Sequence, residues 1–584
     1  MAHTSVGGII GRINGQARKS WISSALKLVG AIACVGLMGV EAGIAAPVEP
    51  WRITKEAWSE TDERGYSEFV ELIGASDCWD VDDCFDNPSN PYRARHGSFR
   101  FRADCADFPY LIRAYYAWMN GLPFAYQNGI LPQSGRTRDI RYTSGGNRVV
   151  SRGNVPATSN GINATSVLVD LQSAISSGSF RVHANANDKR NFTDMYSPRI
   201  GRDTIRPGTS IYDANGHVVL VWRVEDDGRV LTISAHPDNS VSRSFYGRNF
   251  LRTHPRLGAG FKEWRPIRLV GATRAANGSL VGGHIEALPN EALADFSLMQ
   301  YIGTETVDTS LRTFDQWRLA SFVQDGEAVD YYHYVRNVMA SGKLIMNPVN
   351  ELRSSMRSVC YDVRARKEAV EAAIENRIDK QAAPQRLPHN IYGTFGYWEF
   401  YSTPSRDARL KTALKEQRDH IEVLIGLQRQ GSPSVEYAGS NLIGDLIAAY
   451  DEESQKCVTS YTRSNGARVT MTIDNVVDRI FDVSFDPYQC VERRWGARDA
   501  DELSSCRDTP DKTAWYNAQR FLRYQIDRTY DVQMSYTPSE LEAGPHGPFT
   551  GRGVAEKPDL DVRAMLEGMQ NSPRAAAETG SAVR

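Results

Sequence analysis

Arg102-Ala103-Asp104-Cys105-Ala106-Asp107-Phe108-Pro109 stands directly before a strongly helical stretch. Pro109 falls in the expected first turn, where proline is preferred, and Asn120-Gly121 supplies the usual helix stop. Between them the apolar residues recur at helical spacing: Phe108, Leu111, Ile112, Tyr115, Tyr116 and Met119. The pattern predicts a helix that begins just after Cys105.

A histidine opens an apolar strand further along the chain, in Gly216-His217-Val218-Val219-Leu220-Val221-Trp222. The segments 218–224 and 230–234 are alternating and β-branched, and Glu225-Asp226-Asp227-Gly228 between them is a hairpin turn signal. The second strand continues into His236-Pro237-Asp238-Asn239. We therefore expect His217 and a polar residue of that segment on neighbouring antiparallel strands.

A cysteine before a helix and a histidine at a strand end are the pairing that a cysteine hydrolase needs. A thiol attacks as thiolate, and a helix N-terminus favours that anion and offers backbone amides for an oxyanion. His217 would be the base, and His236, Asp238 or Asn239 would orient its ring. Asp107 acts in the opposite direction, since a nearby carboxylate raises the pKa of a thiol.

These residues resemble a family. Asp104-Cys105-Ala106-Asp107-Phe108 resembles the Asp-Cys-Ser-Gly-Phe motif of NlpC-like cell-wall peptidases. Pro207-Gly208-Thr209 and Gly216-His217-Val218 resemble the Pro-Gly-Asp … Gly-His-Val stretch of NlpC-like and CHAP-like amidases. The likeness spans roughly residues 50–285, with Ala106-Asp107 in place of Ser-Gly and longer gaps between the motifs.

The resemblance implies a papain-like fold and amide cleavage, often in peptidoglycan, through a cysteine thioester and without a metal. It implies Cys105 as nucleophile, His217 as base, and His236 or Asp238 as the orienting residue. Two alternatives stay open: a catalytically inactive periplasmic binding or scaffold protein of papain-like shape, and a transglutaminase-like acyl transferase with Asp238 as third member.

The N-terminus has the order of a secretory signal peptide: basic residues, the short apolar run 28–40, then small residues up to Ala45. The expected mature protein is periplasmic or secreted, with no stable membrane insertion after cleavage. Removal of Cys34 leaves an odd number of the eight cysteines, so one thiol is left over in an oxidising compartment. Position along the chain suggests three bridges: Cys78 with Cys84, Cys490 with Cys506, and Cys360 with Cys457. That sorting makes Cys105 the free thiol.

The organisation expected is α+β: a signal peptide at 1–45, a papain-like domain at 46–288, a mostly helical domain at 289–540 and a disordered tail at 541–584. Helices are expected near 59–72, 330–340, 349–376, 405–430 and 514–529. The polar segment 133–163 is predicted to be a long loop over the cleft.

Net charge and missing motifs argue against several classes of partner and enzyme. A net charge of −2 gives no reason to expect nucleic acid as a partner, and the expected partner is a peptide or peptidoglycan-like substrate. No zinc-protease, phosphate-loop, dinucleotide or serine-hydrolase motif occurs, and no cofactor or metal is expected. The acidic cluster at 77–86 lacks the order of a calcium loop and is interpreted as a solvated loop. The aromatic segment 390–407 is either a binding rim, with Trp398 and Tyr401 stacking on a ligand, or a packed loop that leads into a helix.

Overall fold

The computed structural model describes residues 48–571, apart from 136–138, 248, 249, 251, 306–314, 325, 393–395, 530 and 531. The expected signal peptide, with Cys34, lies outside the described residues, as do residues 572–584. Within the described ranges, no helix is both long enough and apolar enough to cross a bilayer.

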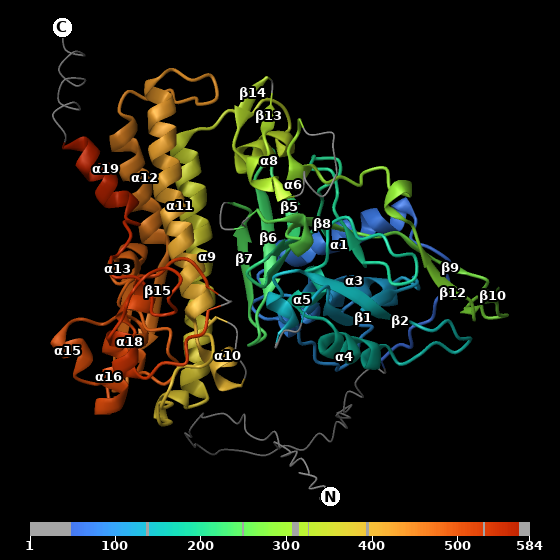
Figure 1. The fold of residues 1–584 in the computed structure, drawn as a ribbon, viewed down its shortest axis with the longest axis horizontal. Helices are drawn as coiled ribbons and strands as arrows, with labels where there is room; N and C mark the ends of the chain where they lie inside the picture. Colours follow the sequence, from blue (N-terminus) through green and yellow to red (C-terminus); the bar gives the residue numbers. More distant parts are fainter. Residues whose placement is uncertain are drawn as a thin grey trace, which may run out of the picture. The chain divides into compact units, whose positions relative to one another are not determined.

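An antiparallel sheet of six strands forms the centre of the first region (Figure 1). Its spatial order is β3 (Met195–Tyr196), β8 (Gly260–Trp264), β4 (Ser210–Asp213), β5 (His217–Val224), β6 (Val230–Ala235) and β7 (Val241–Phe245). All of its pairings are antiparallel. The hairpin expected around residues 225–228 is β5–β6, and the mixed α+β class with an antiparallel sheet is confirmed.

Strand β5 is buried on both faces, which explains its continuous apolar run. Val218 and Leu220 belong to the core cluster shared with α1 (Glu60–Ala75) and α3 (Asp107–Met119). Val219 and Val221 belong to the opposite cluster, shared with Tyr331, Tyr334 and Val335 of α8 (Tyr331–Met339). Helix α8 thus packs on the sheet, although the expected boundary at residue 289 assigns it to the helical region.

Helix α1 begins as the sequence predicts, with Ser59 as N-cap in a reciprocal capping box with Asp62. Other elements of this region surround the sheet or extend from it: α2 (Val81–Asp86), β1 (Ala125–Pro132), η1 (Ile140–Tyr142), β2 (Asn147–Asn154), α4 (Ala164–Ala174), α5 (Ser177–Phe180), η2 (Pro255–Leu257), β9 (Ile267–Val270), β10 (Thr273–Arg274), β11 (Leu280–Val281), β12 (His284–Ala287), η3 (Asn290–Ala292), α6 (Met299–Ile302), η4 (Trp317–Leu319), β13 (Phe322–Gln324) and β14 (Glu327–Val329).

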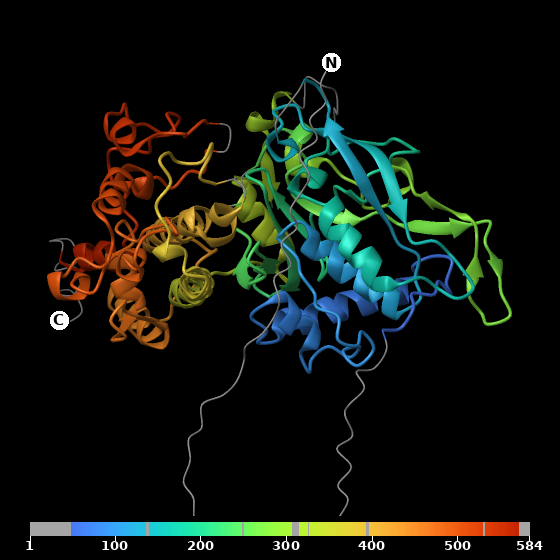
Figure 2. The ribbon, with the colours of Figure 1, turned by 90° about the horizontal axis from the view of Figure 1, so that it is seen from below.

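The second region is mostly helical. Its long helices α9 (Pro348–Glu375), α11 (Pro404–Arg429) and α12 (Leu442–Lys456) pack together, and α9 also lies against β7, as Figures 1 and 2 both show. The remaining elements are η5 (Ile378–Lys380), α10 (Tyr397–Tyr401), β15 (Val458–Thr462), β16 (Arg468–Thr472), α13 (Ile473–Asp478), α14 (Val491–Arg494), α15 (Ala500–Leu503), α16 (Pro510–Ala518), α17 (Arg520–Tyr524), α18 (Pro538–Glu542) and α19 (Val562–Gln570).

Three local expectations were wrong. The segment 133–163 is not one long loop, because η1 and β2 lie within it and β2 pairs with β1. The helix expected at 514–529 is two shorter helices, α16 and α17. Part of the expected disordered tail is the helix α19, whose Leu566 is fully buried in the core shared with α11 and α12. A nine-residue amphipathic helix is easily overlooked in a chain end rich in glycine and alanine.

The cysteine pairing agrees with the parity argument. Disulfides join Cys78 to Cys84, Cys360 to Cys457, and Cys490 to Cys506. Cys105 is the free cysteine of the described chain. The bridge at Cys360 joins α9 to the end of α12.

The Cys360–Cys457 bridge should contribute most to stability, since its partners are 97 residues apart, against 6 for Cys78–Cys84. Loss of loop-closure entropy predicts that replacing both Cys360 and Cys457 by alanine lowers the free energy of unfolding by about 5 kcal/mol. The matched Cys78→Ala/Cys84→Ala variant should lose only about 2 kcal/mol. Urea unfolding of the two variants measures the contrast, and equal losses would contradict it.

Candidate functional site

A cavity of about 150 Å³ lies where the sheet region meets the helical region. The start of α3 contributes Asp104, Cys105 and Ala106, and the sheet contributes Gly216, His217 and His236. The helical region closes the other side with Tyr392, Glu399, Pro404, Ser405, Arg406, Arg409 and Arg528. Three of the four residues predicted as the site therefore line one cavity.

Cys105 stands two residues before the first residue of α3. The carboxylate of Asp104, which lies before the N-cap residue Ala106, binds the backbone at the helix start: its Oδ1 accepts from the N–H of Ala106 at 2.7 Å and of Asp107 at 3.3 Å. The N–H groups expected to hold an oxyanion are thus already bonded to a carboxylate. The helix start positions the thiol, but these two amides are not available in this arrangement.

Burial raises the pKa of the Cys105 thiol well above its ordinary value. The negative charge of Asp104 raises this pKa further, and Asp107 adds a smaller contribution in the direction that the sequence predicted. Asp107 is itself buried next to Asp104, which raises the pKa of its carboxyl group. The thiol is therefore protonated at neutral pH, and something must remove its proton before it can attack.

A tight turn brings His217 beside the thiol. Asp213 pairs with His217 across the β4–β5 hairpin, and Gly216 adopts a positive φ of 87° in the turn between them. The thiol of Cys105 donates to the carbonyl oxygen of Gly216 at 3.8 Å. Among the hydrogen bonds of the described residues, none joins the thiol to His217, so the two side chains share the cavity without a direct bond.

His236 lies across from His217, with the two rings nearly parallel and their centroids 6.0 Å apart. A chain of hydroxyl groups links them: His217 Nε2 to Ser234 Oγ at 3.5 Å, Ser234 Oγ to Ser242 Oγ at 3.3 Å, and Ser242 Oγ to His236 Nε2 at 2.8 Å. Among the described residues, Ser234 thus gives the side-chain hydrogen bond to the ring of His217, while His236 stacks on that ring and is linked to it through Ser242 and Ser234.

Asp238 and Asn239 have other partners. Both carboxylate oxygens of Asp238 accept from Arg406 Nη2 at 2.9 Å, and Ser240 donates to the same group. The side chain of Asn239 bonds to the backbone of Phe101 and Ala103, which ties the sheet to the segment before Cys105. Neither bonds to His217 in the part of the chain that the structure describes.

Burial lowers the pKa of His217 well below its ordinary value, and the positive charges of Arg409, Arg528 and Arg406 lower it further. Burial, with Arg406 and Arg409, has the same effect on the pKa of His236. Both rings are therefore neutral at neutral pH. A neutral imidazole is the form that accepts a proton from a thiol.

Three ion pairs around the cavity join the two regions. Arg528 pairs with Asp213 of the hairpin turn at 2.6 Å, and Arg406 pairs with Asp238. Arg141 of η1 pairs with Glu399 of α10 at 3.1 Å. The positions of Arg141, Arg406 and Arg528 in the cavity wall are thus each set by a carboxylate.

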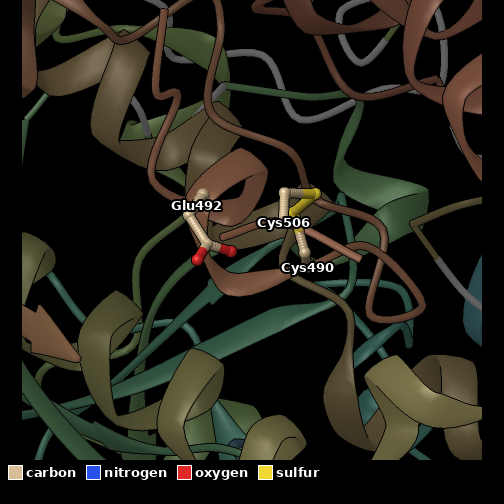
Figure 3. A group of neighbouring side chains, drawn as sticks. All are labelled: Cys490, Glu492 and Cys506. Carbon is tan, nitrogen blue, oxygen red and sulfur yellow. A yellow bond between two sulfur atoms is a disulfide. The ribbon is translucent and has the colours of Figure 1, made fainter. Parts of the chain in front are cut away.

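The described residues hold one group with the spacing of metal ligands, Cys490, Glu492 and Cys506, which Figure 3 shows. The two sulfur atoms form a disulfide and offer no thiolate. The Glu492 carboxylate accepts hydrogen bonds from Ser464 and Ser505. This group does not fit a metal ion.

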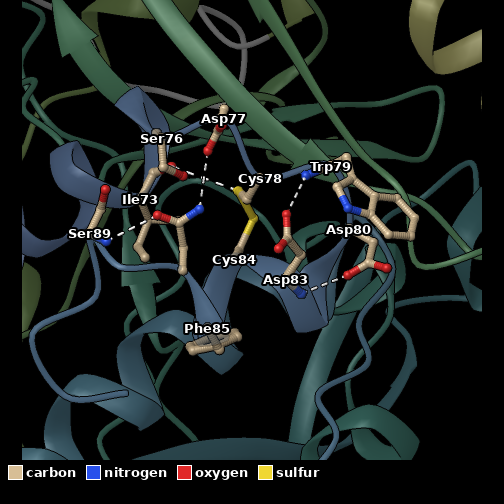
Figure 4. The surroundings of a disulfide bond; sticks show 12 residues. Ile73, Ser76, Asp77, Cys78, Trp79, Asp80, Asp83, Cys84, Phe85 and Ser89 are labelled. Atoms are coloured by element: carbon tan, nitrogen blue, oxygen red, sulfur yellow. Dashed lines mark hydrogen bonds between the residues drawn. A yellow bond between two sulfur atoms is a disulfide. The ribbon is translucent and has the colours of Figure 1, made fainter. Parts of the chain in front are cut away.

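The acidic cluster near the Cys78–Cys84 bridge also serves the local fold (Figure 4). Asp80 caps α2 by accepting from the backbone N–H of Asp83 at 2.7 Å, and Asp83 accepts from that of Trp79. Asp82 accepts from the backbone N–H of Phe101 at 2.8 Å. The expected solvated loop is therefore in large part the helix α2, and its carboxylates organise the start of this helix instead of forming a calcium cage.

The aromatic segment 390–407 contains both buried core residues and residues that line the cavity. Trp398 is buried, and its indole N–H donates to the carbonyl of Ile391, so it is a core residue and no stacking platform. Thr403 is the N-cap of α11, and its hydroxyl bonds to the Asp407 side chain instead of to a backbone N–H. Tyr392 and Glu399 of the same segment line the cavity.

Comparison of the chain with models of protein families, with curated proteins and with solved structures gave no match.

Sequence reasoning missed Ser234, Ser242 and the arginines of the helical region. Ser234 lies in β6 and His236 follows directly after its last residue, so the two-residue spacing of an extended chain was a usable signal. Nothing in the local sequence connects Arg406, Arg409 or Arg528 to Cys105, because only tertiary packing brings them there.

The raised pKa of Cys105 predicts slow alkylation at neutral pH. Iodoacetamide reacts with the thiolate, so Cys105 in the folded protein should react at least about tenfold more slowly than free N-acetylcysteine near pH 7. The rate should still be rising at about pH 9, because the folded pKa lies above the ordinary value. Peptide mass spectrometry of Cys105 measures it, unfolding in guanidinium should abolish the difference, and a rate equal to that of the free thiol would contradict the assignment.

The two buried histidines predict acid sensitivity. Their folded pKa values are lowered, so the unfolded chain binds protons below about pH 6.5 that the folded chain does not. The free energy of unfolding should fall as pH decreases, by up to about 1.4 kcal/mol per pH unit for each ring. His217→Gln should make the decline shallower in urea unfolding between about pH 7 and 5. The exposed His284→Gln serves as control and should follow wild type; an unchanged slope in His217→Gln would be evidence against the burial effect.

Proposed function

We propose that this protein is a cysteine hydrolase of papain-like type that cleaves amide bonds through Cys105, with His217 as base. The observation that carries the proposal is the presence, in one cavity, of the free thiol and a neutral histidine. The arrangement of a cysteine before α3 and a histidine on an antiparallel sheet supports it.

The reaction would proceed as follows. The Cys105 thiol leaves the Gly216 carbonyl by rotation about its Cα–Cβ bond, and His217 takes its proton as the sulfur bonds to the amide carbon. His217 then passes that proton to the departing nitrogen, the C–N bond breaks, and a thioester remains. Water, deprotonated by His217, hydrolyses the thioester and restores the thiol.

Ser234 is the positioning residue in this scheme. Its hydroxyl lies 3.5 Å from His217 Nε2, which leaves Nδ1 as the nitrogen for proton transfer. The Ser234 hydroxyl is in turn hydrogen-bonded to Ser242, whose hydroxyl is bonded to His236 Nε2. The transglutaminase-like alternative needs Asp238 as third member, and the pairing of Asp238 with Arg406 weighs against it.

An exported enzyme fits the three disulfides, which are typical of oxidising compartments. We infer a periplasmic or secreted location and a peptide or peptidoglycan-like substrate, in line with the motif resemblance around Cys105 and His217.

A second function is favoured by a specific observation. Asp104 occupies the amides at the start of α3 and also raises the pKa of the thiol, which suits a binding protein without turnover. Such a protein would hold its ligand in the same cavity and release no product.

The proposal predicts that Cys105→Ser and His217→Ala each lower kcat/KM by at least about 1,000-fold on any peptide or peptidoglycan fragment that wild type cleaves. Mass spectrometry of products from a fragment library measures this, with the exposed His284→Ala variant as control for the histidine change. Full hydrolysis by Cys105→Ser would overturn the proposal. Equal ligand retention by wild type and Cys105→Ser, without product, would support the binding protein, and amine incorporation would support acyl transfer.

A further inference from the structure

One wall of the cavity is built from arginines of the helical region. Arg406 and Arg409 lie in the first two turns of α11, and Arg528 lies after α17. Asp238, the partner of Arg406, and Asp213, the partner of Arg528, are not among the described residues that line the cavity. These two carboxylates therefore bind the arginines from behind the cavity wall. Two acidic residues line the cavity: Asp104, which lies just before α3, and Glu399, which pairs with Arg141.

Arg406 keeps hydrogen-bonding capacity that the protein does not use. A guanidinium has five N–H donors, and Arg406 uses Nη2 for Asp238 and Ser240. Its side chain is 10% exposed, and its Nε is buried without a hydrogen-bond partner. An unsatisfied buried donor is costly, and because the Arg406 side chain also lines the cavity, a small shift of the guanidinium would let a bound acceptor satisfy it.

The N-terminus of α11 adds to the positive electrostatic potential of the arginine wall. Pro404 and Ser405, the first residues of this 26-residue helix, line the cavity beside Arg406. The unpaired N–H groups and the macrodipole of a long helix favour an anion at its N-terminus. The cavity, about 150 Å³, has roughly ten times the space that one water molecule needs.

We propose that this wall is a carboxylate-binding subsite, so that the molecule bound beside Cys105 is an amide with a carboxylate close to the bond that the thiol attacks. Attack by the thiol rests on the proposed function, whereas binding of the acid group does not require turnover. Planar carboxylates match the fork of a guanidinium, which gives the subsite its selectivity. The charges of these arginines also act on His217, so a bound carboxylate would offset the field that disfavours its protonated form.

Two alkylating reagents of nearly equal size test this without any substrate. Iodoacetate carries a carboxylate and iodoacetamide carries an amide, and both modify Cys105 with loss of iodide. We measure the rates at which iodoacetate and iodoacetamide modify Cys105 in the full chain at about pH 9 and take their ratio. This ratio is then divided by the same ratio measured for N-acetylcysteine, which gives a normalised ratio. We expect a normalised ratio above about ten, with iodoacetate showing saturation and competition by N-acetylglycine.

Arg409→Gln should bring the ratio toward one, and Arg409→Lys should retain part of the preference. Arg520→Gln, which removes an exposed arginine of α17, should match wild type. A normalised ratio of one or less in wild type overturns the subsite, even if the protein hydrolyses neutral amides. A high ratio without hydrolysis of any fragment keeps the subsite and removes the cysteine-hydrolase proposal, so the two failures are distinguishable.

Discussion

Pairing of cavity arginines with carboxylates of the other region is the constraint on which the site depends. Asp213 and Asp238 of the sheet bind Arg528 and Arg406, and Glu399 of the helical region binds Arg141. Buried pairs of this kind add little net stability, but breaking one leaves an uncompensated buried charge and is costly. The pairs therefore determine how the helical region closes over the sheet more than how stable the protein is.

The electrostatics of the cavity favour the neutral forms of Cys105 and His217. Burial and the charge of Asp104 raise the pKa of the Cys105 thiol, while burial and the charges of three arginines lower the pKa of His217. The resting site is thus a thiol beside an imidazole, with the proton on sulfur, and not a thiolate–imidazolium pair. If the protein is the proposed hydrolase, the proton would leave the sulfur only when a bound group changes the local field or during the attack on the substrate.

Much of the sheet region could be predicted because its signals are local. The apolar spacing of the helix near 59–72, the glycine at 121 and the Asp227-Gly228 turn each act within a few residues, and cysteine parity needs no geometry. The opposite face of β5 could not be assigned to α8, since an apolar run does not say what covers it. Nor could the cap formed by Asp104 be foreseen, because the same residue fits a motif and a helix start equally well.

The cavity takes side chains from positions as far apart as Asp104 and Arg528. Contacts of such long sequence separation form late in folding, after the loop-closure entropy of the intervening chain has been overcome. A chain that is still emerging can build the hairpin that carries His217 and the helix that follows Cys105, but the arginine wall is missing until the C-terminal segment has docked. Assembly of the site is therefore coupled to folding of the C-terminal segment, and an N-terminal fragment would present the same thiol, histidine and Asp104 without the three arginines that lower the pKa of His217.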